Sequence, residues 1–403
     1  MRKAAVWRCL LLLCLFNGLT SVVRAQPAKP EPNKYLYQID GHDPRTGEKR
    51  IGFIDQTGKV VIGFDRLPKT TIAVGDFHEG RALIYLRKIV RDESREYPDS
   101  VAGYMGETGE VAIAAAFDVA KDFSEGLAYV EVEADGFKGF IDRMGRRVIT
   151  FAGKRAKDFH EGLAASQSEG NKWGYINRSG NWIVRPQYEF ADDFSEGLAG
   201  VVVNGKYGFI NKQGELVIPA HFDLRRERRH PELLISAGRF KEGLAAVAVD
   251  RLYGYINKQG TFAVQPRFFT AQAFSEGLAF VVEMNEINSI VNKAGWIDKS
   301  GRYVITGVEG QISSDDFART FSDPNGLLDW SFSEGLARFG VYRESSYLLG
   351  YIDRQGKVAI EPKQYNRTDR FRGGIAWVEI RDFGMDQDYG YIDKEGRFIW
   401  RSK

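Results

Sequence analysis

Apolar residues in this chain are gathered in short runs that are separated by glycine, proline and polar residues. In the clearest example, the run at 198–203 is followed by Asn204-Gly205, by a second run at 207–210 and by a third, Leu216–Ile218, which ends at a proline. Runs of this length that are rich in β-branched and aromatic residues predict strands, and Asn-Gly predicts a tight hairpin turn because both residues tolerate positive φ. Each unit therefore predicts an antiparallel meander of three or four strands. No stretch beyond residue 25 keeps the 3.6-residue apolar period of a helix.

The meander recurs along the chain and is marked by two glycines six positions apart. The first glycine precedes an aromatic residue and then Ile or Met, and an apolar pair lies three and four residues after the second glycine, from Val61-Ile62 to Ile399-Trp400. A lone meander cannot bury both of its faces, so neighbouring units are expected to stack. The nine glycine pairs are Gly52/Gly58, Gly103/Gly109, Gly139/Gly145, Gly174/Gly180, Gly208/Gly214, Gly254/Gly260, Gly295/Gly301, Gly350/Gly356 and Gly390/Gly396.

A second signature, Phe-x-Glu-Gly, recurs between the units. Its glutamates are Glu79, Glu125, Glu161, Glu196, Glu242, Glu276 and Glu334. Carboxylates can serve acid–base chemistry, but a residue kept in seven equivalent positions predicts a bond to backbone N–H groups at a turn. The Asp and Asn residues that start the turn before each second glycine predict the same framework role. This series is Asp55, Asp142, Asn177, Asn211, Asn257, Asp298, Asp353 and Asp393.

These signatures resemble a known family. Phe-x-Glu-Gly-Leu-Ala, followed by Lys-Trp-Gly-Tyr-Ile-Asn at 172–177, is similar to the WG-repeat family of bacterial tandem β-repeats. Trp173 keeps the tryptophan that names the family, and Tyr207, Tyr253 and Tyr389 hold the equivalent place. The resemblance extends over residues 34–403. It implies a repeat scaffold for interaction, and it implies no shared reaction and no catalytic residues.

The predicted fold class is all-β, built from about nine tandem antiparallel meanders that pack like propeller blades. Units near 40 residues with four strand signals are typical of blades. Nine units exceed the usual four to eight blades, whereas an open superhelical stack tolerates any number. We expect propeller-like packing, with a closed ring and an open stack both compatible with the pattern.

The first 25 residues predict a secretory signal peptide. A basic start precedes the apolar run at 9–16, and Val23-Arg24-Ala25 provides a cleavage site before Gln26. Residues 26–33 then predict a proline-rich linker, and 34–403 the repeat array. This organisation predicts a secreted or periplasmic protein without a transmembrane segment.

Removal of the signal changes the charge and the cysteine count. Cys9 and Cys14 are the two cysteines, so the mature chain would hold none and form no disulfide. Four of the 56 basic residues lie in the signal, which leaves 52 against 54 acidic residues and a net charge of −2. A near-neutral exported chain is a poor partner for nucleic acid.

No motif predicts catalysis, a cofactor or a metal. His78-Glu79 and His160-Glu161 would begin a zinc-protease motif, but the positions that need a second histidine hold Ala82 and Ala164. The segment 386–388 has too few oxygen ligands for calcium. We therefore expect the protein not to be an enzyme.

The repeat spacing stretches at several places, and these are the predicted binding loops. Long hairpin tips at 86–100, 283–293, 342–349 and 380–388 occupy the same point of their units and should project from one edge; insertions lie at 223–239 and 306–331. The binding-loop candidates are Arg91, Tyr97, Arg225, Arg226, Arg228, Arg229, Tyr342, Tyr347, Asp386 and Asp388.

The function predicted from these features is an exported, non-catalytic scaffold that binds a protein or another macromolecule through hairpin tips on one edge. A glycan-binding module of the cell envelope is the alternative, and it requires exposed aromatic residues that stack on sugars. An enzyme hosted on a propeller is a third hypothesis. It requires Asp, Glu or His residues that converge outside the repeat positions.

Overall fold

The computed structural model describes residues 35–42, 45–91, 96–224, 238–284, 291–306, 329–343, 346–380 and 388–402. Contacts divide the chain into Met1–Lys34 and Tyr35–Lys403, and all the described residues belong to the second unit. The predicted signal peptide and linker lie outside the described residues.

The described residues form nine antiparallel sheets, each built from strands that are consecutive in the sequence. We number these sheets as blades 1 to 9. Blade 1 holds β1 (Tyr37–His42), β2 (Lys49–Ile54) and β3 (Val60–Ile62), and blade 2 holds β4 (Thr71–His78), β5 (Arg81–Arg91), β6 (Glu96–Gly106) and β7 (Val111–Phe117). Blade 3 holds β8 (Val119–Ala120), β9 (Leu127–Val132), β10 (Phe137–Asp142) and β11 (Arg147–Thr150), with a single 3-10 turn at Glu133–Asp135. Blade 4 holds β12 (Arg155–His160), β13 (Leu163–Gln167), β14 (Trp173–Asn177) and β15 (Trp182–Tyr188).

The remaining blades repeat this plan. Blade 5 holds β16 (Phe190–Ala191), β17 (Ala199–Val203), β18 (Lys206–Ile210) and β19 (Leu216–Phe222); blade 6 holds β20 (Leu244–Val249), β21 (Leu252–Asn257) and β22 (Phe262–Phe268); blade 7 holds β23 (Thr270–Ala271), β24 (Ala279–Met284), β25 (Val291–Ile297) and β26 (Tyr303–Ile305); blade 8 holds β27 (Leu336–Arg343), β28 (Ser346–Asp353) and β29 (Val358–Tyr365); blade 9 holds β30 (Arg367–Thr368), β31 (Ile375–Ile380), β32 (Asp388–Asp393) and β33 (Phe398–Arg401).

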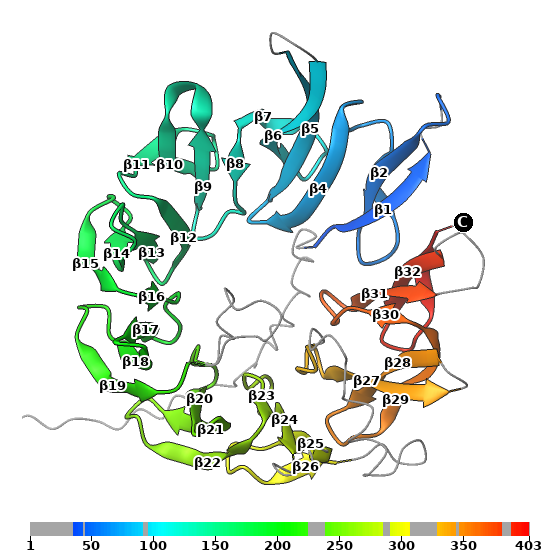
Figure 1. Cartoon of the computed structure of the whole chain (residues 1–403). Coiled ribbons are helices and arrows are strands. Elements are labelled where there is room, and N and C mark those ends of the chain that lie inside the picture. Colours follow the sequence, from blue (N-terminus) through cyan, green and yellow to red (C-terminus); the bar gives the residue numbers. More distant parts are fainter. Residues whose placement is uncertain are drawn as a thin grey trace, which may run out of the picture. The chain divides into compact units, whose positions relative to one another are not determined.

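The blades follow one another around a closed ring, with short first strands such as β16 on its inner side and strands such as β19 on its outer side (Figure 1). Blade 9 closes directly on blade 1. The Tyr391 hydroxyl donates to the Gln38 carbonyl oxygen at 2.7 Å, and the Asp40 N–H donates to the Tyr389 hydroxyl at 2.8 Å. The all-β prediction is confirmed, and the choice between ring and stack is settled as a nine-bladed β-propeller.

The second glycine of each pair sits where neighbouring blades touch. Gly58 has φ +82°, and a Cβ there would lie 2.5 Å from the carbonyl oxygen of Ile399 in blade 9. Other second glycines face an Ile or Val of the preceding blade in the same way: Gly109 faces Ile62, Gly145 faces Ile113, Gly180 faces Ile149, Gly214 faces Val184, Gly260 faces Ile218, Gly301 faces Val264 and Gly396 faces Ile360. Only glycine combines left-handed backbone with this close approach. At these seven junctions the second member of the repeated apolar pair faces the neighbouring blade: Ile62 is 0% exposed and Val61 40%. At the junction of blades 9 and 1, the first member, Ile399, takes this place.

Aromatic residues form the core between blades. Tyr255 and Phe274 pack with ring centroids 4.8 Å apart, and Tyr175 and Phe194 repeat this contact at 4.8 Å. The aromatic residues of the repeat therefore serve packing between blades. Among the aromatic residues whose side chains are described, which excludes Tyr97 and Tyr342, Phe269 alone is exposed.

Candidate functional site

The Phe-x-Glu-Gly turn joins the first and second strands of a blade and bends the chain sharply. Its glutamates adopt the left-handed backbone region, with φ between 52° for Glu79 and 54° for Glu334. A residue with a Cβ loses roughly 1–2 kcal/mol in this conformation. Because glycine would avoid that cost, the glutamate side chain must contribute something that glycine cannot.

That contribution is a bond to the next blade. The Glu196 carboxylate accepts the backbone N–H of Gly243 at 3.0 Å, and Gly243 belongs to the Phe-x-Glu-Gly turn of the following blade. Lys258 of that same blade lies 3.2 Å from the Glu196 carboxylate. We call this arrangement of glutamate, glycine N–H and basic residue the glutamate clasp. The other glutamate–glycine bonds are Glu79–Gly126, Glu125–Gly162, Glu161–Gly197, Glu242–Gly277, Glu276–Gly335 and Glu334–Gly373/Gly374.

The basic partner comes from the turn before the second glycine of the next blade. Arg178 contacts Glu125, Lys212 contacts Glu161, Lys299 contacts Glu242 and Lys394 contacts Glu334, at 3.1–3.9 Å between charged atoms. That turn is itself held by its Asp or Asn. Asn211 Oδ1 accepts N–H bonds from Gln213 and Glu215, both at 3.0 Å. Both framework predictions are confirmed, and the glutamate bond is found to run between blades.

The clasp is lost at both junctions of blade 1. At the junction with blade 9, Gly373 stands in the glutamate position with φ +60°, and Gln56 replaces the basic residue. At the junction with blade 2, the described residues of blade 1 include no Phe-x-Glu-Gly turn, and Glu107 replaces the basic residue. We call these two junctions the seam. Blades 6 and 8 also have three strands, but both keep the turn and the clasp.

Arg372 bridges the inner rim across the seam. Its guanidinium lies 3.5 Å from the Asp76 carboxylate and donates to the Phe77 carbonyl oxygen of blade 2 at 3.5 Å. In blades 3, 5, 7 and 8, a serine at this position makes the corresponding bond, as Ser195 does to the Phe240 carbonyl at 2.7 Å. The arginine therefore spans a longer gap with weaker bonds, because blade 1 contributes no such turn among the described residues.

A first hollow, about 750 Å³, opens beside Arg372. Its polar lining combines Arg370, which pairs with Asp329 at 3.0 Å, and Arg338, which is 7% exposed and donates to the Thr368 carbonyl at 2.6 Å. Burial raises the pKa of the Asp369 carboxyl in the same hollow. Both arginines of this hollow are therefore already bound to partners within the protein.

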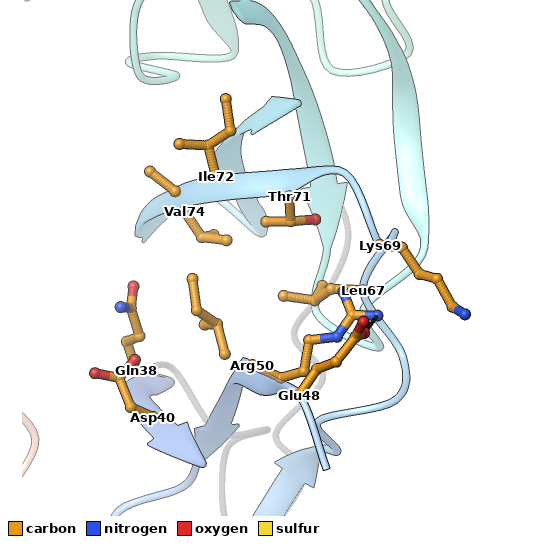
Figure 2. Close-up of a pocket in the computed structure, with 11 residues that line it drawn as sticks. Gln38, Asp40, Glu48, Arg50, Leu67, Lys69, Thr71, Ile72 and Val74 are labelled. Carbon is orange, nitrogen blue, oxygen red and sulfur yellow. Dashed lines mark ion pairs between the residues drawn. The ribbon is translucent and has the colours of Figure 1, made fainter. Parts of the chain in front are cut away.

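A second hollow, about 630 Å³, lies between blades 1 and 2; we call it the Arg50 hollow. Figure 2 shows Gln38 and Asp40 on one side, Thr71, Ile72 and Val74 of β4 on the opposite side, and Arg50 beside Leu67. Arg50 lies at the start of β2, and Glu48 lies just before β2, in the turn that joins it to β1.

Acidic and basic groups also meet on the inner rim of blades 3 to 5. Lys157 lies 3.6 Å from Asp192, and His160 lies 3.6 Å from Asp193. Burial lowers the pKa of the Lys157 ammonium and raises the pKa of the Asp158 carboxyl. Lys157 and His160 are thus paired with aspartates of the next blade, whereas Oδ1 of Asp158 has no hydrogen-bond partner in the described structure. Within the described ranges no group of three or more His, Cys, Asp or Glu side chains could hold a metal ion.

The sequence-predicted binding residues fall into two groups. Arg225, Arg226, Arg228, Arg229 and Asp386 lie outside the described residues. The rest are in paired strands: Arg91 is opposite Glu96, Tyr97 opposite Val90, Tyr342 opposite Tyr347, and Asp388 opposite Ile380.

Two of these side chains are already engaged. Tyr347 packs against the core of blades 7 and 8, and Asp388 forms an ion pair with Arg401. The hairpins are consequently more strand and less loop than their spacing predicted: 86–91 and 96–100 pair throughout, as do 342–343 and 346–349. The binding role of the ten residues stays a prediction.

Sequence reasoning missed the seam. Arg50, Asp76 and Arg372 were not predicted, although the repeat pattern in the sequence breaks next to blade 1. Gly373, Gln56 and Glu107 are the three substitutions that break the paired glutamate–basic pattern, and all three border blade 1. In the described part of the chain, no helix has the length and apolar character needed to cross a membrane.

Comparisons with known proteins agree with the repeat. The family described as "WG containing repeat" matches residues 103–134, 173–207, 207–224, 253–285 and 350–382. No curated protein sequence is significantly similar to the chain.

Similar solved structures share little sequence. BamB from Moraxella catarrhalis is 12% identical, with a TM-score of 0.37 over 72% of this chain and 86% of its own. The β-propeller domain of the Trilobed protease from Pyrococcus furiosus is 10% identical, with a TM-score of 0.33 over 82% and 97%. The extracellular domain of a one component system from B. thetaiotaomicron is 11% identical, with a TM-score of 0.32 over 90% and 55%. The fold assignment rests on the nine sheets themselves.

Proposed function

Since the chain carries WG repeats at five places and folds as a nine-bladed β-propeller, we propose that it is an exported, non-catalytic scaffold that binds a macromolecular partner through the hairpin-tip face of the ring. Secretion or a periplasmic location is part of this proposal and is supported by the signal-like sequence of residues 1–25.

The observation that carries the proposal is the difference between the two faces. In an antiparallel blade, the turn between the second and third strands lies at the end opposite the other two turns. The glutamate clasps join those other two turns in successive blades, so the clasps share one face and the hairpin tips share the other. On the clasp face, the glutamates and their basic partners join successive blades. The tip face carries the stretched hairpins, where a partner can be recognised.

The glycan alternative is weakened by the burial of the aromatic residues. Stacking on a sugar needs an exposed ring, and Phe269 is the single exposed aromatic residue among those whose side chains are described, a set that excludes Tyr97 and Tyr342. The enzyme alternative is weakened because Lys157 and His160, the basic groups described on the inner rim, are already paired with Asp192 and Asp193.

The test is a matched pair of variants. Replacing residues 342–347 with Asn-Gly joins Val341 to Leu348, which already face each other, by a two-residue turn. This variant should still fold, with a lower Tm because it loses the packing of Tyr347 against blades 7 and 8, and it should lose a partner that is captured by crosslinking in the native envelope. The control, Lys212→Ala, alters the clasp face and should keep the partner. Loss of the partner in the control but not in the shortened hairpin would assign binding to the wrong face and refute the proposal.

A further inference from the structure

Arg50 is a buried cation whose hydrogen-bonding groups are poorly satisfied. Its side chain is 9% exposed, and its Nε has no hydrogen-bond partner. The nearest carboxylate, that of Glu48, lies 3.6 Å from Nη2 and belongs to a side chain that is 61% exposed. A buried charge normally has close, well-aligned partners, because removal from water is costly.

The neutral partner of Arg50 is also shared. Nη1 donates to the Pro68 carbonyl oxygen at 3.3 Å. That oxygen already accepts the Thr71 N–H at 3.0 Å and the Thr71 hydroxyl at 2.7 Å. A carbonyl oxygen has two lone pairs. Arg50 is therefore the third and most distant of three donors on one acceptor, and its guanidinium can accommodate a better one.

The space next to Arg50 can contain a ligand. The Arg50 hollow, about 630 Å³, falls within the range typical of small-molecule sites. Ile51, Leu67 and Val74 give it an apolar wall, and Ile72 is 48% exposed there. Figure 2 shows the hollow between these side chains, whereas Lys69 points away from it. Cation and apolar wall together match a molecule with an anionic end and a short apolar body.

We propose that the Arg50 hollow binds a small amphipathic carboxylate, with the carboxylate on the Arg50 guanidinium and the apolar body against Ile51, Leu67 and Val74. A planar guanidinium with free N–H groups suits bidentate recognition of a carboxylate. Asp40, on the opposite side of the hollow, disfavours a second negative charge on the ligand. The proposal is independent of the hairpin-tip function and goes beyond it.

The two natural sources of such a group are a free short-chain acid and the C-terminus of a peptide. Hexanoate represents the first and N-acetyl-leucine the second, and each has a neutral amide, hexanamide or N-acetyl-leucinamide, as its matched control. Titration calorimetry of the protein should show binding of at least one acid and at least tenfold weaker binding of its amide. The acid that binds more tightly identifies the source. Equal binding of acid and amide, or no binding of either acid at 10 mM, would overturn the proposal.

Variants test the location. Arg50→Gln should weaken binding of the acid at least tenfold, whereas Arg45→Gln should change it less than threefold, because Arg45 is 78% exposed and pairs with Asp65. Ile72→Glu places a negative charge in the hollow at a half-exposed position, so it should fold and weaken binding at least tenfold. Ile72→Gln, its neutral match, should not. If Arg50→Gln does not fold, the location is tested by comparing Ile72→Glu with Ile72→Gln. Equal affinities of these two variants for the acid would refute the site.

Discussion

Blades 2 to 9 and blade 1 solve the same packing problem in different ways. In blades 2 to 9, which we call the arc, seven glutamates in a strained backbone conformation each bind the following blade. A basic residue pairs with most of these glutamates. At the seam, no clasp forms among the described residues, and Arg372 contacts blade 2 instead, while the Tyr391–Gln38 bond repeats one that the other blades also make. A glutamate in place of Gly373 would clash, because a Cβ there would lie 2.5 Å from the Tyr35 ring and 2.5 Å from the Tyr37 hydroxyl oxygen. The comparison teaches that a repeat is regular where it serves the framework, and that the contacts between blades change where the regularity ends.

The largest expected effect tests the core of the arc. Phe240 is fully buried, and Phe240→Ala should lower the free energy of unfolding by about 3–5 kcal/mol because it leaves a cavity. Tyr37 packs at the seam and is half-buried, so Tyr37→Ala should cost about 1–2 kcal/mol. Denaturant unfolding checks both values. Equal losses would remove the distinction between arc and seam.

The second effect tests the clasp. Glu242→Ala should lower the free energy of unfolding by about 1–3 kcal/mol, because it leaves the Gly277 N–H without its acceptor and keeps the left-handed backbone. Lys299→Ala should cost less than about 1 kcal/mol, because Lys299 is 47% exposed. A double-mutant cycle measures their coupling. A cost for Lys299→Ala above that for Glu242→Ala would contradict the account, in which the backbone bond dominates.

How far the sequence could predict this structure depends on what each residue contacts. Asn211 and Gly214 act within their own turn, so local spacing revealed their roles. Glu242 acts on the next blade, and its partner Gly277 is 35 residues away. Spacing predicted a backbone bond for it but not the direction of that bond. Ring closure depends on Tyr391 meeting Gln38, 353 residues apart, and no local pattern encodes such a contact. Arg50 was missed because its importance comes from the poor bonds it makes, which depend on Pro68 and Thr71 in a neighbouring segment.

The third effect compares one hydrogen bond in the two regions. Tyr391→Phe removes the bond to Gln38, and Tyr255→Phe removes the equivalent bond from Tyr255 to the Gln272 carbonyl, also 2.7 Å long. Each should lower the free energy of unfolding by about 0.5–1.5 kcal/mol. Hydrogen exchange should distinguish the two variants. Tyr391→Phe should speed exchange in β1 and β2 because it weakens the contact with blade 1. Tyr255→Phe should have little effect on those strands because it weakens the contact between blades 6 and 7.

The smallest effect depends on pH. Burial raises the pKa of Asp158, and its Oδ1 has no hydrogen-bond partner in the described structure. A carboxyl with a raised folded-state pKa favours the folded protein when protonated, and this stability is lost as the pH rises through the folded pKa. Asp158→Asn should therefore match the wild type near pH 4 and exceed its free energy of unfolding by up to about 1 kcal/mol at pH 7. A difference that shrinks as the pH rises from 4 to 7 would reverse the assigned sign.

Native-state hydrogen exchange tests the central claim most directly, namely that the glutamate clasps lock the arc and leave the seam as the place where the ring opens. Peptides from blade 1 (residues 37–62) should exchange at least tenfold faster than peptides from blade 5 (residues 199–222), through an opening that is smaller than global unfolding. Uniform protection of all nine blades, or slower exchange in blade 1 than in blade 5, would contradict it.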